Sequence, residues 1–269
     1  MYDIWTVDVP MQRWPVANWC LICFIVVASI FAWNMTDDAE PRRLTQLIQE
    51  LREAERLNDP QRREASLKEV MQKIERFEIN HGVPGTLHPH HFHFYQLLTS
   101  MLVHANLSHL IGNMFFLLVF GNAINAKLGH GWYLLCFFAI GIAENLLWLL
   151  IGGGRSCLGA SAAIMGIVGL FLVFYPRNDI KMVWWFYGIQ VDEYYISAFW
   201  IILLYVVLDL IGAIWFGNAG IGFVAHLAGA GIGFVLGIVA LKLGWIEPVY
   251  EEENLLQTLG YQKKLKRWE

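Results

Sequence analysis

Long apolar runs separated by short polar breaks make up most of this chain. Six of these runs are close to the ~20 helical residues needed to cross a hydrocarbon core of ~30 Å. Two of the six retain polar side chains, among them His109, Asn113 and His226, although such groups are costly to insert into lipid. The pattern predicts an all-α, polytopic membrane protein with six transmembrane helices, at about 17–34, 106–126, 131–151, 157–175, 194–216 and 221–243.

A charged segment, residues 35–94, separates the first two apolar runs. Apolar residues recur at helical spacing over 44–51 and again over 67–77. Between these stripes, Asp59 suits an N-cap and Pro60 suits the first position of a new helix. The segment therefore predicts a helical hairpin whose stripes bury each other or lie on the bilayer surface. A lid or a partner-binding module is the alternative.

These patterns divide the chain into four parts. The first contains the N-terminal segment and first span, the second is the hairpin, the third is a core of five spans, and the last is a polar tail that includes the sequence KKLKR. Their boundaries are 1–34, 35–94, 95–245 and 246–269.

Composition and charge support a membrane protein and suggest its orientation. Hydrophobic residues make up 57% of the chain and charged residues only 16%, with a mean hydropathy of +0.45, whereas soluble domains carry about 25% charged residues. Basic residues in short loops mark the cytoplasmic side. One side of the expected bundle collects most of them, and the short loops of the other hold only Arg155. We therefore expect both termini in the cytoplasm and the hairpin outside. The short soluble tails and the six-span core are typical of prokaryotic proteins, so we expect a bacterial plasma membrane as the location.

The fourth and sixth runs carry matching small residues. Gly166 belongs to a nearly bare surface on the fourth run, and Gly229 and Gly233 belong to a face of the sixth that repeats every fourth residue. Such faces let two helix backbones approach closely in lipid. If these helices pack together, Ser161 and His226 come within hydrogen-bond reach.

This pairing has a chemical meaning. A serine hydroxyl becomes a good nucleophile when a neighbouring imidazole removes its proton. His109 and Asn113 lie four residues apart on one helix face and, with the Ser161 backbone N–H, offer donors for an oxyanion. Asp209 and Glu144 are intramembrane carboxyl candidates, but the sequence places neither beside His226, so a Ser–His dyad is the simplest hypothesis.

Three motifs in order, "LVHANLSHLIGNMFFLLVFG", "GASA" and "AHLAGAGIGFVLG", resemble the rhomboid family of intramembrane serine proteases. The resemblance implies a six-helix rhomboid bundle that needs no cofactor or metal and cleaves transmembrane protein substrates within the lipid bilayer. It also implies that the glycine-rich loop "WFGNAGIGF" caps the site. Ser161 would be the nucleophile, His226 the general base, and His109 and Asn113 the oxyanion donors, with His104 and Gly159 in support.

The chain departs from the family pattern at two positions near the serine. Ala162 follows Ser161 where the family has glycine, and Met165 stands where many members have an aromatic residue. These departures favour, as the alternative, a weak or inactive rhomboid-like protein that binds transmembrane helices.

Two further questions stay open in the sequence. A histidine-rich tract, residues 88–93, could indicate a metal transporter, but no span presents a string of metal ligands, and an interfacial segment near the site is the preferred interpretation. The hairpin could close over the site, bind substrate or mediate self-association. Nothing indicates a nucleic-acid partner.

Overall fold

The computed structural model describes residues 5–9, 12–36, 41–186, 189–216, 222–246 and 253–261. Each of the six apolar runs contains a helix. The chain forms two compact units, the first from residues 1–23, 111–144 and 161–269 and the second from residues 24–110 and 145–160. Helices α1, α5 and α7 contribute residues to both.

Among the described residues, four helical stretches are long and apolar enough to cross a membrane. Two more apolar helices, α8 (Ser161–Phe174) and α9 (Ala198–Phe216), complete the set. The protein is therefore an integral membrane protein by length and composition, while the count of six spans stays a prediction. The four long stretches are α1 (Val16–Asn34), the continuous run of α5 (Leu107–Phe116), the π-helical turn η2 (Leu117–Gly121) and α6 (Asn122–Leu128), then α7 (His130–Ile151) and α10 (Phe223–Lys242).

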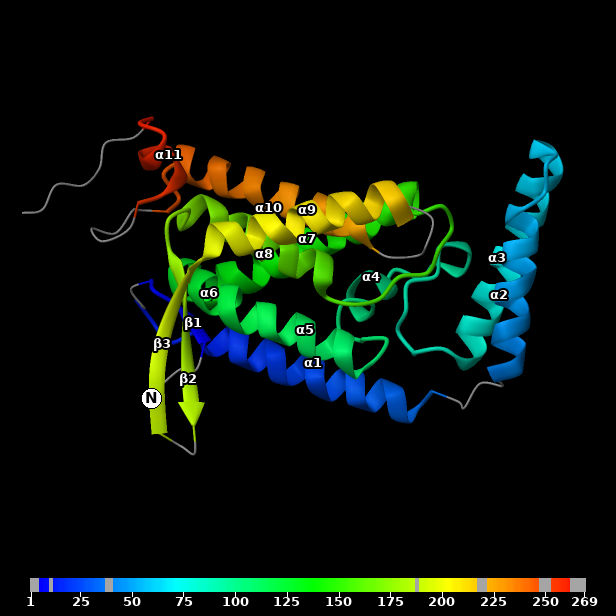
Figure 1. Cartoon of the computed structure of the whole chain (residues 1–269), viewed down its shortest axis with the longest axis horizontal. Coiled ribbons are helices and arrows are strands. Elements are labelled where there is room, and N and C mark those ends of the chain that lie inside the picture. The colour runs from blue at the N-terminus through cyan, green and yellow to red at the C-terminus, as the bar shows by residue number, and fades with distance from the viewer. Residues whose placement is uncertain are drawn as a thin grey trace, which may run out of the picture. The chain divides into compact units, whose positions relative to one another are not determined.

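A three-stranded antiparallel sheet in the first unit corrects the all-helical expectation. Its strands are β1 (Trp5–Val7), β2 (Asp179–Phe186) and β3 (Ile189–Ser197), in the order β1-β2-β3 (Figure 1). The segment "IQVDEYYIS" is rich in β-branched and aromatic residues, which favour strands. Because β3 continues to Ser197, the fifth apolar helix begins at Ala198 and not near 194 as expected.

The first unit is built around α8, which is buried along nearly its whole length. Helix α10 packs against it (Figure 1), and glycines allow the contact. A Cβ built at Gly233 would lie 1.9 Å from the carbonyl oxygen of Gly166, and one at Gly237 would lie 2.9 Å from the Cβ of Val173. The two backbones therefore touch directly. The short helix α11 (Leu255–Thr258) also contacts α8.

A buried polar cluster in the same unit surrounds the π-helical turn. The amide of Asn18 on α1 donates at 2.8 Å to the Leu117 carbonyl and at 2.8 Å to the Asn122 side chain. The Tyr133 hydroxyl donates to the side-chain oxygen Oδ1 of Asn18, and the Asn125 side chain accepts from the Asn18 backbone N–H. Because a π turn disturbs the regular helical ladder, this cluster satisfies polar groups that lipid could not.

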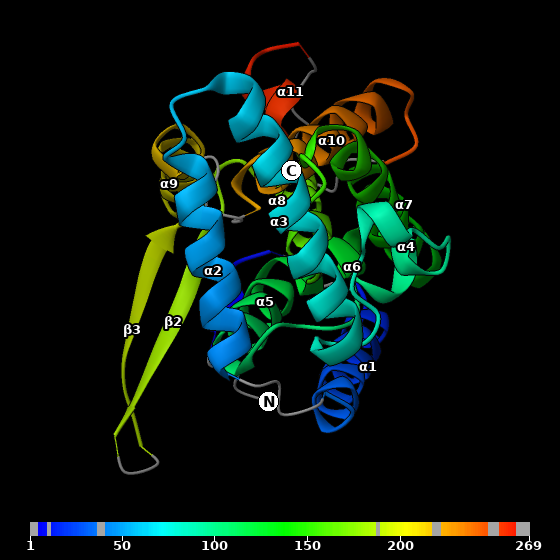
Figure 2. The same ribbon diagram turned by 90° about the vertical axis from the view of Figure 1, so that its right-hand side faces the viewer.

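The second unit contains the charged hairpin. Helices α2 (Pro41–Glu55) and α3 (Pro60–His81) lie side by side (Figure 2). Asp59 caps α3 by accepting from the N–H groups of residues 61 and 62, which confirms the predicted helix start. Leu47 and Ala54 on α2 and Val70 on α3 are buried, as expected if the two apolar stripes cover each other. The short helices η1 (Pro89–His91) and α4 (Gln96–Thr99) follow.

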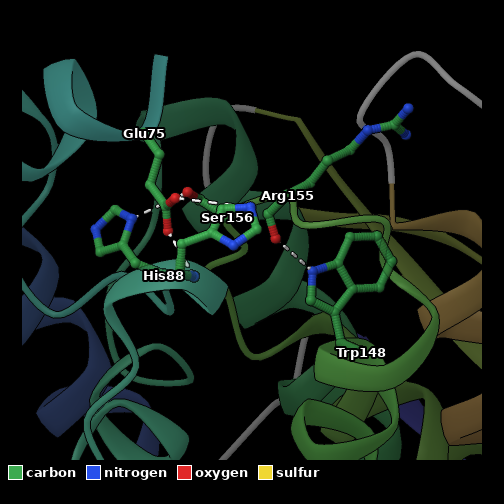
Figure 3. Close-up of polar contacts among 6 residues, drawn as sticks. Glu75, His88, Trp148, Arg155 and Ser156 are labelled. Carbon is green, nitrogen blue, oxygen red and sulfur yellow. Dashed lines mark hydrogen bonds and ion pairs between the residues drawn. The ribbon is translucent and has the colours of Figure 1, made fainter. Parts of the chain in front are cut away.

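Polar contacts connect α3 to η1 and connect the later segments of this unit to one another (Figure 3). The buried carboxylate of Glu75 accepts from the His90 backbone N–H at 3.0 Å. His88 Nδ1 lies 2.9 Å from the Ser156 hydroxyl, and Trp148 donates to the Arg155 carbonyl at 2.9 Å.

The histidine tract does not converge on one centre. His88 and His90 have the separate partners just given, and His93 stacks on Tyr95. Across the described ranges, no group of three or more His, Cys, Asp or Glu side chains is arranged to hold a metal ion.

The α8–α10 contact predicts different effects for two glycines of α10. Gly233→Ala should destabilise the protein by about 1–3 kcal/mol, because the methyl group collides with the Gly166 backbone. Gly231→Ala, on the same helix with nothing within 4 Å, should have no destabilising effect. Thermal unfolding of the purified proteins in detergent measures both. Equal transition temperatures for the Gly233→Ala and Gly231→Ala variants would show that the α8–α10 contact does not limit stability.

The hairpin predicts a pH dependence that involves Glu78 on α3. Burial raises the pKa of Glu78, and the nearby Glu75 carboxylate raises it further, although a hydrogen bond from Ser156 lowers it. A carboxyl whose folded-state pKa is raised contributes stability that is fully present below its ordinary pKa of 4.5 and is lost as the pH rises through the raised value.

Glu78→Gln should therefore increase hydrogen-exchange protection of α3 near pH ~8, with the difference from wild type vanishing near pH ~4. Glu69→Gln is the matched control, because Glu69 is exposed on the same helix. His88, whose pKa is lowered by burial, is common to all variants and cancels in the comparison. A protection gain in the control equal to that of Glu78→Gln would contradict the assignment.

Candidate active site

Ser161 is the first residue of α8 and is half-buried. Gly159, two residues earlier, has φ +114°, which glycine adopts readily and which stops the helix from extending further toward the N-terminus. At ~1.5 Å per residue, α8 is ~21 Å long, which is shorter than a hydrocarbon core of ~30 Å. A helix of this length does not reach across the hydrocarbon core by itself, and Ser161 is the residue at its N-terminal end.

The turn of α10 that carries His226 lies near the same end of α8. A Cβ built at Gly229 would lie 2.1 Å from the carbonyl oxygen of Ala162. Ala162 follows Ser161 directly, and His226 precedes Gly229 by about one helical turn. Gly229 contacts Ala162, and four residues later in both helices Gly233 contacts Gly166. Because the residue numbers of both partners rise together, α8 and α10 run parallel. Ser161 and His226 both belong to the N-terminal turns of these paired helices.

The imidazole ring of His226 contacts a carboxylate through its Nδ1 atom. Its Nδ1 atom lies 3.2 Å from both carboxylate oxygens of Asp209, which projects from α9. Asp209 is buried and the imidazole of His226 is partly exposed. When the imidazole proton resides on Nδ1 and is hydrogen-bonded to Asp209, Nε2 carries a lone pair. This tautomer of His226 can accept a proton from a nucleophile at Nε2.

The sequence did not identify Asp209 as the partner of His226. The sequence offered two intramembrane carboxyl groups as candidates, and only the folded structure distinguishes which of them lies next to His226. Glu144 on α7 is also buried and acts on His226 electrostatically, but Asp209 is the carboxylate within hydrogen-bond distance. The available signal was that a carboxyl group retained in an apolar helix needs a polar partner.

Asn113 on α5 presents an amide with unused donor capacity. The residue is 9% exposed, and its Nδ2 atom is buried without a hydrogen-bond partner in the described part of the chain. Buried polar atoms normally have partners, and one without a partner calls for a reason. An amide that awaits a substrate oxygen would be such a reason, because oxyanion donors are satisfied only when substrate is bound.

His104 and His109 lie together in the second unit, with ring centroids 5.1 Å apart. His104 is fully buried. Its Nδ1 lies 3.1 Å from the Ser29 hydroxyl, and its carbonyl accepts from Trp33 at 2.6 Å. Burial, and to a smaller extent the neighbouring His109, lower the pKa of His104 to about 3. His104 is therefore neutral at physiological pH, which suits a residue that holds a neighbour in place rather than one that exchanges protons.

The remaining predicted residues lie as follows. Ala162 and Met165 are buried in α8, and the Gly159 N–H donates to the Ser100 carbonyl at 2.7 Å. Residues 217–221 of the expected glycine-rich cap lie outside the described residues, as do residues 247–252 of the C-terminal tail and its basic sequence KKLKR.

Comparison with known proteins identifies relatives of the chain. The family model described as the rhomboid domain matches residues 91–243, more than half of the chain. The chain is 32% identical over 92 residues to "Rhomboid-like protein 11, chloroplastic" of Arabidopsis thaliana, covering 34% of this chain and 31% of that protein. It is 28% identical over 156 residues to "RHOMBOID-like protein 6, mitochondrial" of the same plant, covering 57% and 47%. The chain thus spans about a third to about half of the length of these curated relatives.

The contrast between two buried asparagines generates a prediction. Asn113→Leu should leave stability unchanged or raise it by up to about 1–3 kcal/mol, because it removes a buried donor that has no partner among the described residues. Asn145→Leu is the matched control and should destabilise, since Asn145 donates to Leu97 and Ser100. Chemical unfolding in mixed micelles compares the two. If Asn113→Leu lowered the free energy of unfolding as much as Asn145→Leu does, the Asn113 amide would not be an unpartnered donor.

Proposed function

Because the chain belongs to the rhomboid family, we propose that it is an intramembrane serine endopeptidase that cleaves transmembrane segments of membrane proteins. The observation that supports this most is the packing of Gly229 on the Ala162 carbonyl. It brings the helical turn with the imidazole of His226 to the beginning of the helix that starts at Ser161. A nucleophile and its base need this proximity before any chemistry follows.

In the proposed mechanism, the Ser161 hydroxyl attacks the scissile carbonyl carbon while its proton moves to Nε2 of His226. The carbonyl electron pair moves to the oxygen, which accepts hydrogen bonds from the His109 and Asn113 side chains and the Ser161 backbone N–H. The tetrahedral intermediate then collapses, and His226 protonates the leaving amine. Water, activated by the same imidazole, hydrolyses the acyl-enzyme and regenerates Ser161.

The unpartnered amide of Asn113 supports its part in this scheme. A donor that is already satisfied by the protein would have to break a hydrogen bond before it could bind an oxyanion. The Asn113 amide, without a partner in the described residues, has no such bond to break. Preorganised donors of this kind stabilise the transition state without a cost of reorganisation.

A helix-binding protein with little or no proteolytic activity is the second candidate. Ala162 stands directly after the serine where the family has glycine, and its backbone forms the tight contact with Gly229. Met165 replaces an aromatic residue that supports the histidine in many members. The relatives found carry names that call them rhomboid-like, with no activity stated.

Partners and location follow from the same proposal. The substrates are transmembrane helices of other proteins, and the hairpin of α2 and α3 is the surface best suited to a protein partner or to self-association. The names of the relatives refer to the chloroplast and the mitochondrion, so they lend no support to the bacterial plasma membrane expected from the sequence. A shared cytoplasmic side for both termini stays a prediction from charge.

Covalent labelling tests the proposed activity. A fluorophosphonate should label the wild-type protein and fail to label Ser161→Ala, because the phosphonate reacts with the activated serine oxygen. His226→Ala should slow labelling by about 10²–10⁴-fold, the usual contribution of a general base. Ser66→Ala, on α3 of the hairpin, is the matched serine control and should label like wild type. Equal weak labelling of wild type and Ser161→Ala would favour the helix-binding candidate.

A further inference from the structure

We propose that Asp209 is a positioning residue that holds His226 in the tautomer and orientation needed by the general base. This inference rests on the proposed function and extends the Ser–His pair to a third side chain. It is carried by the 3.2 Å contacts between His226 Nδ1 and both oxygens of the Asp209 carboxylate.

The placement of Asp209 on α9 is specific. Most side chains of this helix from Leu203 to Ile214 are exposed, as lipid-facing residues are, whereas Ile202 and Asp209 are buried. These two lie seven residues apart, or about two helical turns, and so share a face. Helix α9 contacts α10, so the only acidic residue of α9 points toward the helix that carries His226. A carboxyl group elsewhere on α9 would face lipid and gain nothing to offset its burial.

A neutral imidazole has two tautomers, and only one of them serves this reaction. Nε2 must carry the lone pair that accepts the Ser161 proton, so the proton of the resting imidazole must reside on Nδ1. A hydrogen bond from Nδ1 to the Asp209 carboxylate selects that tautomer and fixes the ring plane. When Nε2 takes up the Ser161 proton, Asp209 remains ionised and stabilises the resulting imidazolium.

Among the described residues, no other side chain near His226 offers an equivalent hydrogen bond. Met165, four residues after Ser161, has a thioether that neither stacks like an aromatic ring nor accepts strong hydrogen bonds. Glu144 on α7 is a second buried acidic group, and its interaction with His226 is electrostatic rather than a hydrogen bond. Asp209 is therefore the group that can orient the ring, and Glu144 provides a control for charge alone.

The kinetic test uses the full-length protein in detergent and a transmembrane reporter substrate. Asp209→Asn should lower kcat at least about tenfold, with KM within about twofold of wild type, because the chemical step and not substrate binding is affected. Asp209→Glu should recover part of the loss, since it restores the carboxylate. Glu144→Gln, the same carboxylate-to-amide change without the hydrogen bond, should leave kcat within about twofold. Thermal unfolding of each variant verifies the fold.

A second measurement separates this inference from the proposed function, because it requires no catalysis. Nitrogen chemical shifts of ¹⁵N-histidine-labelled protein, assigned with His226→Gln, report the tautomer of His226. The Nδ1-protonated form should dominate in wild type and lose that dominance in Asp209→Asn. Unchanged His226 shifts, or a kcat of Asp209→Asn equal to wild type, would overturn the role of Asp209. Absence of fluorophosphonate labelling in wild type with the predicted tautomer change would instead refute the protease while leaving the Asp209–His226 pairing supported.

Discussion

Direct contact between the backbones of α8 and α10 is the constraint on which the candidate site depends. Ordinary side chains keep the axes of packed helices about 8–10 Å apart, so that the two backbones do not touch. Glycines at 166, 229 and 233 remove that separation. The close approach supplies dispersion contacts between the helices, which is how helices associate where lipid removes the hydrophobic drive. One run of small residues therefore serves both the stability of the first unit and the chemistry proposed at its end.

As a rule, buried polar groups inside the described apolar helices have hydrogen-bond partners. Asn18, Tyr133, Asn145 and the pair of Asp209 and His226 each make hydrogen bonds. Those contacts offset the cost of burying them. The Asn113 amide departs from the rule within the described residues. Natural proteins tend to break such local rules at functional sites, so the departure agrees with the placement of Asn113 in the proposed oxyanion site.

The features predicted well from sequence are those encoded by neighbouring residues. Helical spacing and apolar length identified each apolar helix, and the Asp59-Pro60 sequence located the start of α3. Features that depend on distant segments were missed. The sheet needs pairing between β1 and β2, more than 170 positions apart, and its third strand resembles the beginning of a span because Tyr194, Tyr195 and Ile196 are apolar. The pairing of Asp209 with His226 likewise depends on how α9 packs on α10, which no spacing within either helix reveals.

The cluster around Asn18 has a consequence for how the protein is made. Asn18 is synthesised well before its partners Leu117, Asn125 and Tyr133, which follow 99, 107 and 115 residues later. During that interval its amide has none of its final partners, and an unsatisfied polar group in hydrocarbon costs several kcal/mol. Asn18 on α1 therefore gains its full set of hydrogen bonds only after the chain has been made as far as Tyr133. Assembly of this part of the bundle thus brings α1 together with segments that are made about a hundred residues later.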